Sequence, residues 1–476
     1  MKVILDGGAY VSRSIVSTDQ RCVNLFIEVD EPGAEGSVFP STHYPAPGLI
    51  LLATAPDNAA WRCLFRAKAT GDLYGVCGSS VYYISKTWVL QNLGSIASTT
   101  GMVSMCDNGF TILMVDGSST GYTIDLVSRA FAVLVDPNFY GGTRVDTADT
   151  YFIMNRPNTN NFVISLTNQA AFGPLDIASK TSTPDRLQSV AVMGDNLWLF
   201  GNLTTEVWYN TGASDFTFGK IPGVFIEHGV CAQYSVAKYE LNLYWLSQNE
   251  AGQTIVMRGN SLQAQRISTH AIEAEFGKYG DISDAIGFTV QMGGHAWYYL
   301  TFPGADNTWV WDESTKFWHE RVSVDNNGVW HRHRANCVSF AYGRNVCGDF
   351  SNGQLYAFDF NTYNDAGLPI VYVRTLPHMM EEARLVTYRR FVADMEVGGG
   401  DSNLPMPLIS LRWSDNRGTT FNDWVTMPMG TAGQYITSVQ WWGLGTARDR
   451  VFELMWSANV RTALNGAWVD MIGLKA

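Results

Sequence analysis

The sequence predicts an all-β protein, a β-propeller of about seven blades, with six blades as the alternative. Three observations predict it: the composition, a series of repeated hairpins, and the scarcity of helical patterns. The 476 residues include 45 Gly, 16 Trp, 21 Tyr and 24 Phe. Aromatic side chains favour strands, and glycine favours the turns between them. Apolar residues make up 46% and charged residues only 16%, which excludes a disordered chain.

Seven pairs of short apolar strands, each folded around a polar or glycine-containing turn, repeat along the chain. They begin at Leu73, Thr111, Tyr151, Leu197, Leu243, Trp297 and Val346. Successive starts are 38 to 54 residues apart. Alternating strands bounded by Gly, Asn, Asp and Pro predict hairpins, and a repeat of about 40–50 residues is typical of a propeller blade. A ring buries each small sheet against its neighbours, whereas the alternative is one or two β-sandwiches with hairpins of coincidental spacing.

Changes in pattern divide the chain into three predicted parts. Residues 1–60 are expected to be an extended N-terminal arm, because the segment Glu31 to Leu49 is rich in proline and glycine and is not expected to form regular structure. The arm either closes the propeller by donating a strand or lies across a neighbouring subunit. Residues 61–378 form the predicted propeller. Residues 379–476 resume strand alternation after a glycine run and predict a C-terminal antiparallel, sandwich-like β domain.

One helix is predicted. It begins after Ser268 or Thr269, either of which is a suitable N-cap, and it places Ile272 and Phe276 on one face. Helical patterns are otherwise scarce.

His270 and Glu273 are three residues apart on this helix, with Glu275 nearby, a spacing that can bring two metal ligands to one face. The second histidine of zinc peptidases is missing, so a solvated helix face is the preferred interpretation and no metal site is predicted. The cationic run His331–Arg334, with His319–Arg321 upstream, is suited to an anion, a partner carboxylate or titration at acidic pH. A solvated loop between blades is the preferred interpretation there.

The sequence predicts no catalytic residues, no cofactor site and no enzymatic activity. It contains no G-x-S-x-G elbow, no Walker loop and no dinucleotide fingerprint. Residues Ser414–Phe421 resemble the Asp-box (S-x-D-x-G-x-T-W), with Asn416 in place of the usual Asp and Phe421 in place of the Trp. Asp-boxes occur in sialidases, but one degenerate copy outside the propeller is expected to stabilise a turn.

The cysteines and the net charge indicate where the chain is made and which partners it is not expected to bind tightly. Seven cysteines without a C-x-x-C pair predict free, mostly buried thiols made in a reducing cytosol (Cys22, Cys63, Cys77, Cys106, Cys231, Cys337 and Cys347). No signal peptide and no apolar span long enough for a bilayer are recognised, so no membrane insertion is expected. The formal charge of −12, from 32 basic and 44 acidic residues, argues against tight binding to DNA phosphates.

Several stretches resemble the tail hub, or nozzle, proteins of short-tailed phages, also described as packaged-DNA stabilisation proteins. They are Leu197–Gly212 (LWLFGNLTTEVWYNTG), Gln265–Glu273 (QRISTHAIE), LTFP with TWVWD and WHER between Leu300 and Arg321, Gln20–Leu25 with Pro47–Leu49, and GTARDRVFEL from Gly445. Their order and spacing carry the resemblance. None is catalytic, so it implies an architecture and no active site, and it leaves the partner-binding residues unknown.

The resemblance implies a virion protein, assembled in the host cytoplasm, that forms a homo-hexameric ring below the portal and its adaptor ring. Such a ring extends the channel through which double-stranded DNA leaves, helps to retain the packaged genome, and offers surfaces to tail spikes, fibres or a needle. We hypothesise that an acidic lumen, with 6 × −12 = −72 charges in the ring, repels the DNA phosphates so that the duplex passes without sequence recognition. The alternatives are a glycan-binding or glycan-cleaving propeller of the sialidase or lectin kind, and a cellular scaffold propeller.

Overall fold

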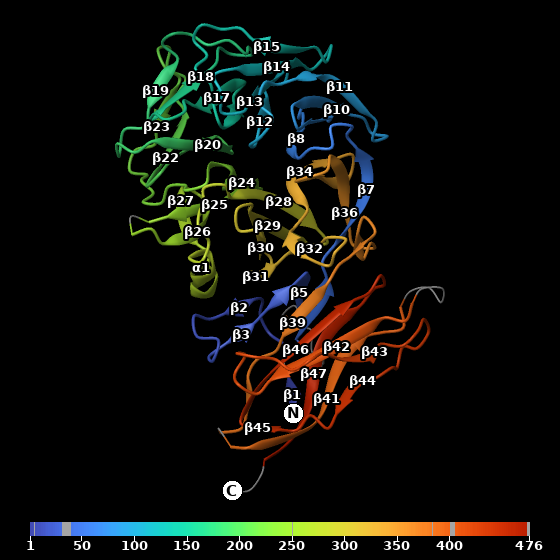
Figure 1. Ribbon diagram of the computed structural model, residues 1–476. Helices are drawn as coiled ribbons and strands as arrows, with labels where there is room; N and C mark the ends of the chain where they lie inside the picture. Colours follow the sequence, from blue (N-terminus) through green and yellow to red (C-terminus); the bar gives the residue numbers. More distant parts are fainter. Residues whose placement is uncertain (4, 31–39, 250, 383, 400–404, 474–476) are drawn as a thin grey trace.

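The computed structural model describes residues 1–3, 5–30, 40–249, 251–382, 384–399 and 405–473. Figure 1 shows a ring of small sheets above a second β unit that contains the C-terminal strands of the chain, with the N-terminus near that unit. Strands dominate the described residues, as predicted. The helices among them are one α-helix, α1 (His270–Phe276), and one turn of 3₁₀-helix, η1 (Gln233–Ser235).

The ring contains, within the described residues, seven four-stranded antiparallel blades. The first three blades are β8–β11 (Trp61–Arg66, Leu73–Cys77, Ser80–Ile84, Leu90–Ser95), β12–β15 (Ser104–Asp107, Thr111–Val115, Gly121–Asp125, Phe131–Leu134) and β16–β19 (Val145–Ala148, Tyr151–Asn155, Asn161–Ile164, Ile177–Ser179). The next three are β20–β23 (Leu187–Met193, Asn196–Gly201, Thr205–Asn210, Phe218–Lys220), β24–β27 (Ala237–Tyr239, Asn242–Gln248, Thr254–Asn260, Gln263–Arg266) and β28–β31 (Ile286–Met292, His295–Phe302, Asn307–Asp312, Phe317–Glu320). The seventh contains β34–β36 (Ala335–Ala341, Arg344–Asp349, Gln354–Asp359) and β7 (Gly48–Thr54).

The predicted hairpins are the two middle strands of each blade, so the propeller prediction is confirmed. The middle strands are buried on both faces because each blade packs between two others; all five residues of β9, for example, are buried. The innermost strands contact one another around the ring, and β34 of the last blade contacts β8 of the first. Tryptophans fill the spaces between blades, as where Trp198 of β21 packs against Trp245 of β25 with ring centroids 6.2 Å apart.

The N-terminal segment closes the ring. β7 is the outer strand of the seventh blade and pairs antiparallel with β36, with Leu49 opposite Phe358. Of the two roles predicted for residues 1–60, strand donation is therefore the one seen in the chain. The expectation of irregular structure from Glu31 to Leu49 is wrong where the structure describes it, because Ser41–Pro45 forms β6 and Gly48 begins β7. Pro45 is tolerated as the last residue of its strand, and residues 31–39 lie outside the described residues.

The second unit packs two sheets and contains strands from both ends of the chain. Its first sheet has the order β44-β41-β47-β6-β5, with β1 on β47 and β45 on β41. These strands are β44 (Val439–Trp442), β41 (Val386–Glu396), β47 (Ala463–Gly473), β5 (Leu25–Val29), β1 (Lys2–Val3) and β45 (Thr446–Ala447). The facing strands are β39 (Tyr372–Thr375), β46 (Asp449–Ser457), β42 (Leu408–Ser414) and β43 (Val425–Pro428), with β40 (Met379–Met380) on β46. The N-terminal strands thus belong to both units.

One short strand joins the two units into a continuous sheet. β4 (Cys22–Val23) pairs in parallel with β31 of the sixth blade, through Val23 and Glu320, and antiparallel with β39, through Val23 and Val373. The resulting ten-stranded sheet runs from the propeller into the C-terminal unit. The remaining short strands are β2 (Tyr10–Val11) with β3 (Asp19–Gln20), β32 (Val322–Val324) with β33 (Trp330–Arg332), and β37 (Asn364–Asp365) with β38 (Leu368–Pro369).

Because β7 closes the ring, replacing two of its leucines by alanine should lower the free energy of unfolding by very different amounts. Leu49 is fully buried in a cluster that includes Phe26, Trp297 and Tyr356, whereas Leu51 is 46% exposed. Leu49→Ala should lower the free energy of unfolding by about 3 kcal/mol, because it leaves a cavity where the ring closes. Leu51→Ala, the matched control on the same strand, should cost about 1 kcal/mol or less. Urea unfolding followed by tryptophan fluorescence measures both, and equal losses would contradict the assigned closure.

Candidate functional site

Buried arginines hold the N-terminal segment where the propeller meets the C-terminal unit. Arg374 of β39 is fully buried. Its guanidinium donates to the carbonyl oxygens of Gly7 at 3.0 Å, Gly8 at 3.3 Å and Arg21 at 3.3 Å, and to the side-chain oxygen of Gln20 at 3.1 Å. Carbonyl groups of an irregular segment need such donors when they are removed from water. The Arg374 side chain therefore holds residues 7–8 and residues 20–21 in place.

Asn24, just after β4, makes the matching contacts toward the propeller. Its side-chain NH₂ donates to the carbonyl oxygens of Val322 at 3.0 Å and Val371 at 2.9 Å, and its Oδ1 accepts from the N–H of Val322 at 3.0 Å. Its φ of 54° is in the left-handed region that asparagine tolerates. The buried Arg321 donates to the carbonyl oxygen of Leu25 at 2.9 Å. These contacts place the β5–β6 hairpin beside the last two blades.

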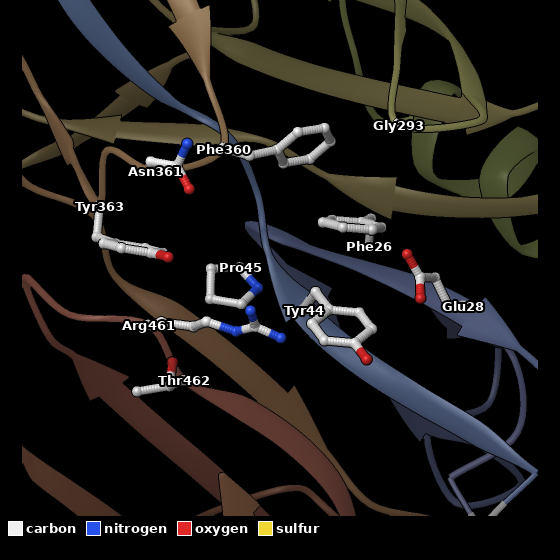
Figure 2. A pocket seen from close by; sticks show the side chains of 10 residues that line it. All are labelled: Phe26, Glu28, Tyr44, Pro45, Gly293, Phe360, Asn361, Tyr363, Arg461 and Thr462. Carbon is white, nitrogen blue, oxygen red and sulfur yellow. The ribbon is translucent and has the colours of Figure 1, made fainter. Parts of the chain in front are cut away.

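A pocket of about 310 Å³ opens at this junction. Figure 2 shows side chains from four parts of the chain around it. The hairpin β5–β6 and the segment after β36 contribute most of the lining, and the β28–β29 and β46–β47 turns complete it. The lining residues are Phe26, Glu28, Tyr44, Pro45, Gly293, Phe360, Asn361, Tyr363, Arg461 and Thr462.

Aromatic rings form much of the pocket wall. Phe26 stacks on Tyr44 with ring centroids 5.6 Å apart, and lies 5.6 Å from the ring of Phe360. Gly293 has a φ of 57°, and a Cβ atom added there would lie 2.8 Å from the Phe360 ring. The turn between β28 and β29 therefore approaches the wall closely only because it carries glycine. Tyr363 completes the wall on the side opposite Glu28 (Figure 2).

The charged groups around the pocket are mostly carboxylates. The Glu28 side chain is 50% exposed, and its nearest described basic neighbour is His295, whose Nε2 lies 3.8 Å away. The other ring nitrogen of His295 lies 2.6 Å from Asp312. Although burial opposes it, hydrogen bonding to His295 and Ser314 lowers the pKa of Asp312 to about 2, so this carboxylate stays ionised. The arrangement fixes the histidine ring with one nitrogen facing Glu28.

The charges around the pocket also affect the pKa values of its two tyrosines, Tyr44 and Tyr363. Burial raises the pKa of Tyr44, and the carboxylates of Glu28, Glu396 and Asp30 act in the same direction against Arg461. Burial likewise raises the pKa of Tyr363; Arg461 opposes the shift, and Glu396 and Asp359 add to it. Both phenols are therefore neutral at physiological pH and available as hydrogen-bond donors.

Of the residues considered as metal ligands, His270 and Glu273 lie together, with Nδ1 3.9 Å from Oε2, but other side chains occupy the Glu273 carboxylate. Thr269 caps α1 by accepting the N–H of Ile272, so the predicted helix and its cap are confirmed. Glu273 is buried and accepts from Arg266, with Nε to Oε1 at 2.5 Å, and from Ser268 at 2.6 Å. The His270 side chain is 76% exposed. Among the described residues, no group of three or more His, Cys, Asp or Glu side chains is placed to hold a metal ion.

The cationic run His331–Arg334 is structural. The expectation of a solvated loop is wrong for Arg332 and His333, which are buried. β33 pairs with β32, which turns Arg332 toward the ring of Phe350 at 4.2 Å and stacks His333 on Phe358. Burial lowers the pKa of His333 to about 3, so it is neutral at physiological pH.

The other two members of the run contact carboxylates. His331 lies 2.8 Å from a carboxylate oxygen of Asp306, and Arg334 lies 3.4 Å from Asp349. Upstream, Glu320 accepts a hydrogen bond of 2.8 Å from Arg21, and so joins β31 to the N-terminal segment. The run therefore stabilises the contact between the sixth and seventh blades instead of presenting free cations.

The Asp-box-like segment forms a turn after β42, as predicted. Oδ1 of Asn416 accepts from the hydroxyl of Ser414 at 2.7 Å and from the N–H of Thr420 at 2.9 Å. Gly418 has a φ of 89°, where glycine is favoured, and its N–H donates to the Ser414 hydroxyl at 2.9 Å. These side-chain contacts satisfy backbone N–H groups of the turn. The segment therefore has a structural role that explains its residues, and no catalytic role is needed.

All seven cysteines are free, and six of them are buried, which confirms the thiol prediction. Burial raises the pKa of Cys63 to about 12. Thiols held in this state are poor nucleophiles.

A family model described as Bacteriophage P22 Gp10, beta-propeller, matches residues 1–363. The chain belongs to this family. The resemblance and the propeller prediction are confirmed by this match, which supports a structural or stabilising role in a phage and is consistent with a protein without enzymatic activity. Of the stretches that resemble the family, GTARDRVFEL lies beyond the matched residues. No helix among the described residues is long and apolar enough to cross a membrane.

Other comparisons add little. No curated protein matches the chain. Among solved structures, the WD40 β-propeller domain of Doa1 is 10% identical, with a TM-score of 0.41, and the match covers 66% of this chain and 97% of that one. The computationally designed Ika8 protein is 12% identical, with a TM-score of 0.38, and the match covers 66% of this chain and 100% of that one.

Sequence patterns did not indicate the pocket. Its four aromatic residues come from three separate segments, and only the proline-rich composition around Tyr44 marks one of these segments as unusual. The resemblance pointed to Gln20–Leu25, which reaches the edge of the site. Contacts between distant segments bring the remaining lining residues together.

Asp365, beside the cationic run, predicts a pH-dependent stability. Burial raises the pKa of this carboxyl group to about 7, although Arg334 and Arg321 oppose the shift. Between about pH 4 and pH 7 the unfolded chain releases this proton while the folded chain retains it, so stability falls as the pH rises. Asp365→Asn should remove this contribution and stabilise the protein at pH 8 by at most about 4 kcal/mol, with little effect at pH 4.

Chemical unfolding of both proteins across this pH range measures the difference. Asp195→Asn, in an exposed turn of the fourth blade, is the matched control and should leave the profile unchanged. A parallel pH profile for wild type and Asp365→Asn would contradict the buried, protonated state.

Proposed function

We propose that the chain is a subunit of the tail nozzle of a short-tailed phage. Six copies form a ring below the portal and its adaptor, extend the DNA exit channel, help to retain the packaged genome, and offer surfaces to spikes, fibres or a needle. The protein is then a virion component assembled in the host cytoplasm. The observation that carries the proposal is a closed propeller joined to a second β unit by one continuous sheet, in a chain of the P22 Gp10 family.

The continuous sheet suits a component that must resist bending between its two units. Relative motion of two domains is expected unless their interface is large. Here β4 pairs with a strand of each unit, so a hinge between them would break backbone hydrogen bonds. A ring that holds DNA under pressure requires subunits that resist such bending.

A tyrosine side chain crosses part of the propeller interior, which supports a channel between copies and not through a single propeller. Tyr234 of η1, which lies between the fourth and fifth blades in the chain, reaches the segments just before the second and third blades. Its hydroxyl lies 3.2 Å from the carbonyl oxygen of Met102 and 3.1 Å from that of Thr143, which precede the second and third blades. A space bridged by one tyrosine side chain is too narrow for a duplex. The DNA path therefore runs along the axis of the ring of subunits.

The charge of the chain predicts the character of that path. With a formal charge of −12 per subunit, the lumen should be lined mainly by carboxylates, which repel phosphates and let the duplex slide. A structure of the assembled ring by electron cryomicroscopy tests this. Lysine and arginine as the main lining residues would contradict the expectation.

Assembly on a template is the direct test of the nozzle. Mass photometry of the purified 52.7 kDa chain, alone and mixed with the portal–adaptor complex of the same particle, should show a gain of about six copies only on mixing. A propeller of unrelated family is the control and should not bind. If the chain stays near its own mass in both samples, the nozzle proposal loses its support and a glycan array becomes the next experiment.

A further inference from the structure

The pocket at the junction of the hairpin, the last two blades and the C-terminal unit has the size and lining of a binding site. Its volume of about 310 Å³ is at the lower end of the range for small-ligand sites, which also prefer junctions between domains. It is large enough for one long side chain. The contacts that shape its wall leave Glu28 half-exposed at one side.

The wall favours a cation with a flat shape. Phe26, Tyr44, Phe360 and Tyr363 surround the space shown in Figure 2. The faces of aromatic rings carry partial negative charge and attract cations. A guanidinium group gains more there than an ammonium group, since it is planar, weakly hydrated and able to stack.

The charges favour a cation as well. Arg461, the cationic lining residue, is ion-paired with Glu396, at 3.2 Å between Nε and Oε1. Glu28 lies at the mouth with a histidine nitrogen at 3.8 Å, and Asp30 and Asp359 add to burial, against Arg461, in raising the pKa values of the pocket tyrosines. An anion meets repulsion from these carboxylates, whereas a cation gains charge attraction in addition to the hydrogen bonds that a neutral sugar would make.

We propose that this pocket receives an arginine side chain of a partner protein, with the guanidinium stacked on the aromatic wall and its N–H groups donating to Glu28. Arginine and aromatic residues are the side chains that most often dominate binding energy at protein interfaces. The pocket is therefore an anchor point for a partner on the surface where the propeller meets the C-terminal unit. The proposal concerns the isolated chain and does not depend on the formation of a ring.

The test uses the full chain and a small probe. The peptide acetyl-Gly-Arg-Gly-amide is titrated by saturation-transfer NMR and calorimetry, beside the isosteric but neutral citrulline peptide and the neutral sugar maltotriose. The arginine peptide should bind saturably and more weakly at high salt, and the citrulline peptide should bind about tenfold more weakly. Glu28→Gln should weaken the arginine peptide about fivefold, and Tyr363→Ala should do so by a similar factor.

Glu227→Gln is the matched control, since Glu227 is exposed on a loop of the propeller away from the pocket lining. It should bind the arginine peptide like the wild type. Thermal unfolding shows whether each variant is folded, and Glu28 and Tyr363 give two independent variants. Equal binding of arginine and citrulline peptides, saturable binding of maltotriose alone, no binding of any probe, or full binding by both folded pocket variants would each overturn the proposal. None of these outcomes bears on assembly with the portal–adaptor complex, whose failure is measured separately.

Discussion

The architecture depends on the backbone pairing of two residues, Cys22 and Val23. The strand they form, β4, lies between β31, the last strand of the sixth blade, and β39 of the C-terminal unit. Without it these strands would each end a sheet with unpaired, buried N–H and C=O groups, which is costly. The ring closure by residues 48–54 follows from the same placement, because β4 fixes where the chain starts before it runs through the hairpin to the seventh blade.

Buried polar groups make this placement specific. Arg374 and Arg321 are almost fully removed from water and donate to carbonyl groups of the N-terminal segment. Burying a cation without a carboxylate costs free energy, and the hydrogen bonds to several carbonyl oxygens offset part of it. An alternative register of residues 7–25 would leave these guanidinium groups without acceptors. The arginines thus select one arrangement out of many that apolar contacts alone would tolerate.

The pocket is a consequence of the same junction. Four segments that are distant in sequence meet there: the hairpin β5–β6 contributes residues of two paired strands, and the other three segments are turns or strand ends. Turns at the meeting point of rigid sheets commonly carry function, because the sheets hold them in place while their sequence can vary. A structural subunit with no catalytic group can therefore still possess a specific binding site.

Local patterns in the sequence determined the elements, whereas tertiary contacts determined how they are joined. The seven hairpins, the cap of α1 by Thr269, the turn around Asn416 and the buried thiols were predictable, because each depends on alternation, capping or composition within a few residues. The motifs also indicated the family. The residues left open whether the N-terminal arm closes the ring, and they did not predict the insertion of β4, the burial of Arg332 and His333, or the pocket. Periodicity shows that a face is buried but not which other segment covers it. β4 and β7 pair with strands about 300 residues away along the chain, and Arg332 and His333 pack on Phe350 and Phe358 of the next blade.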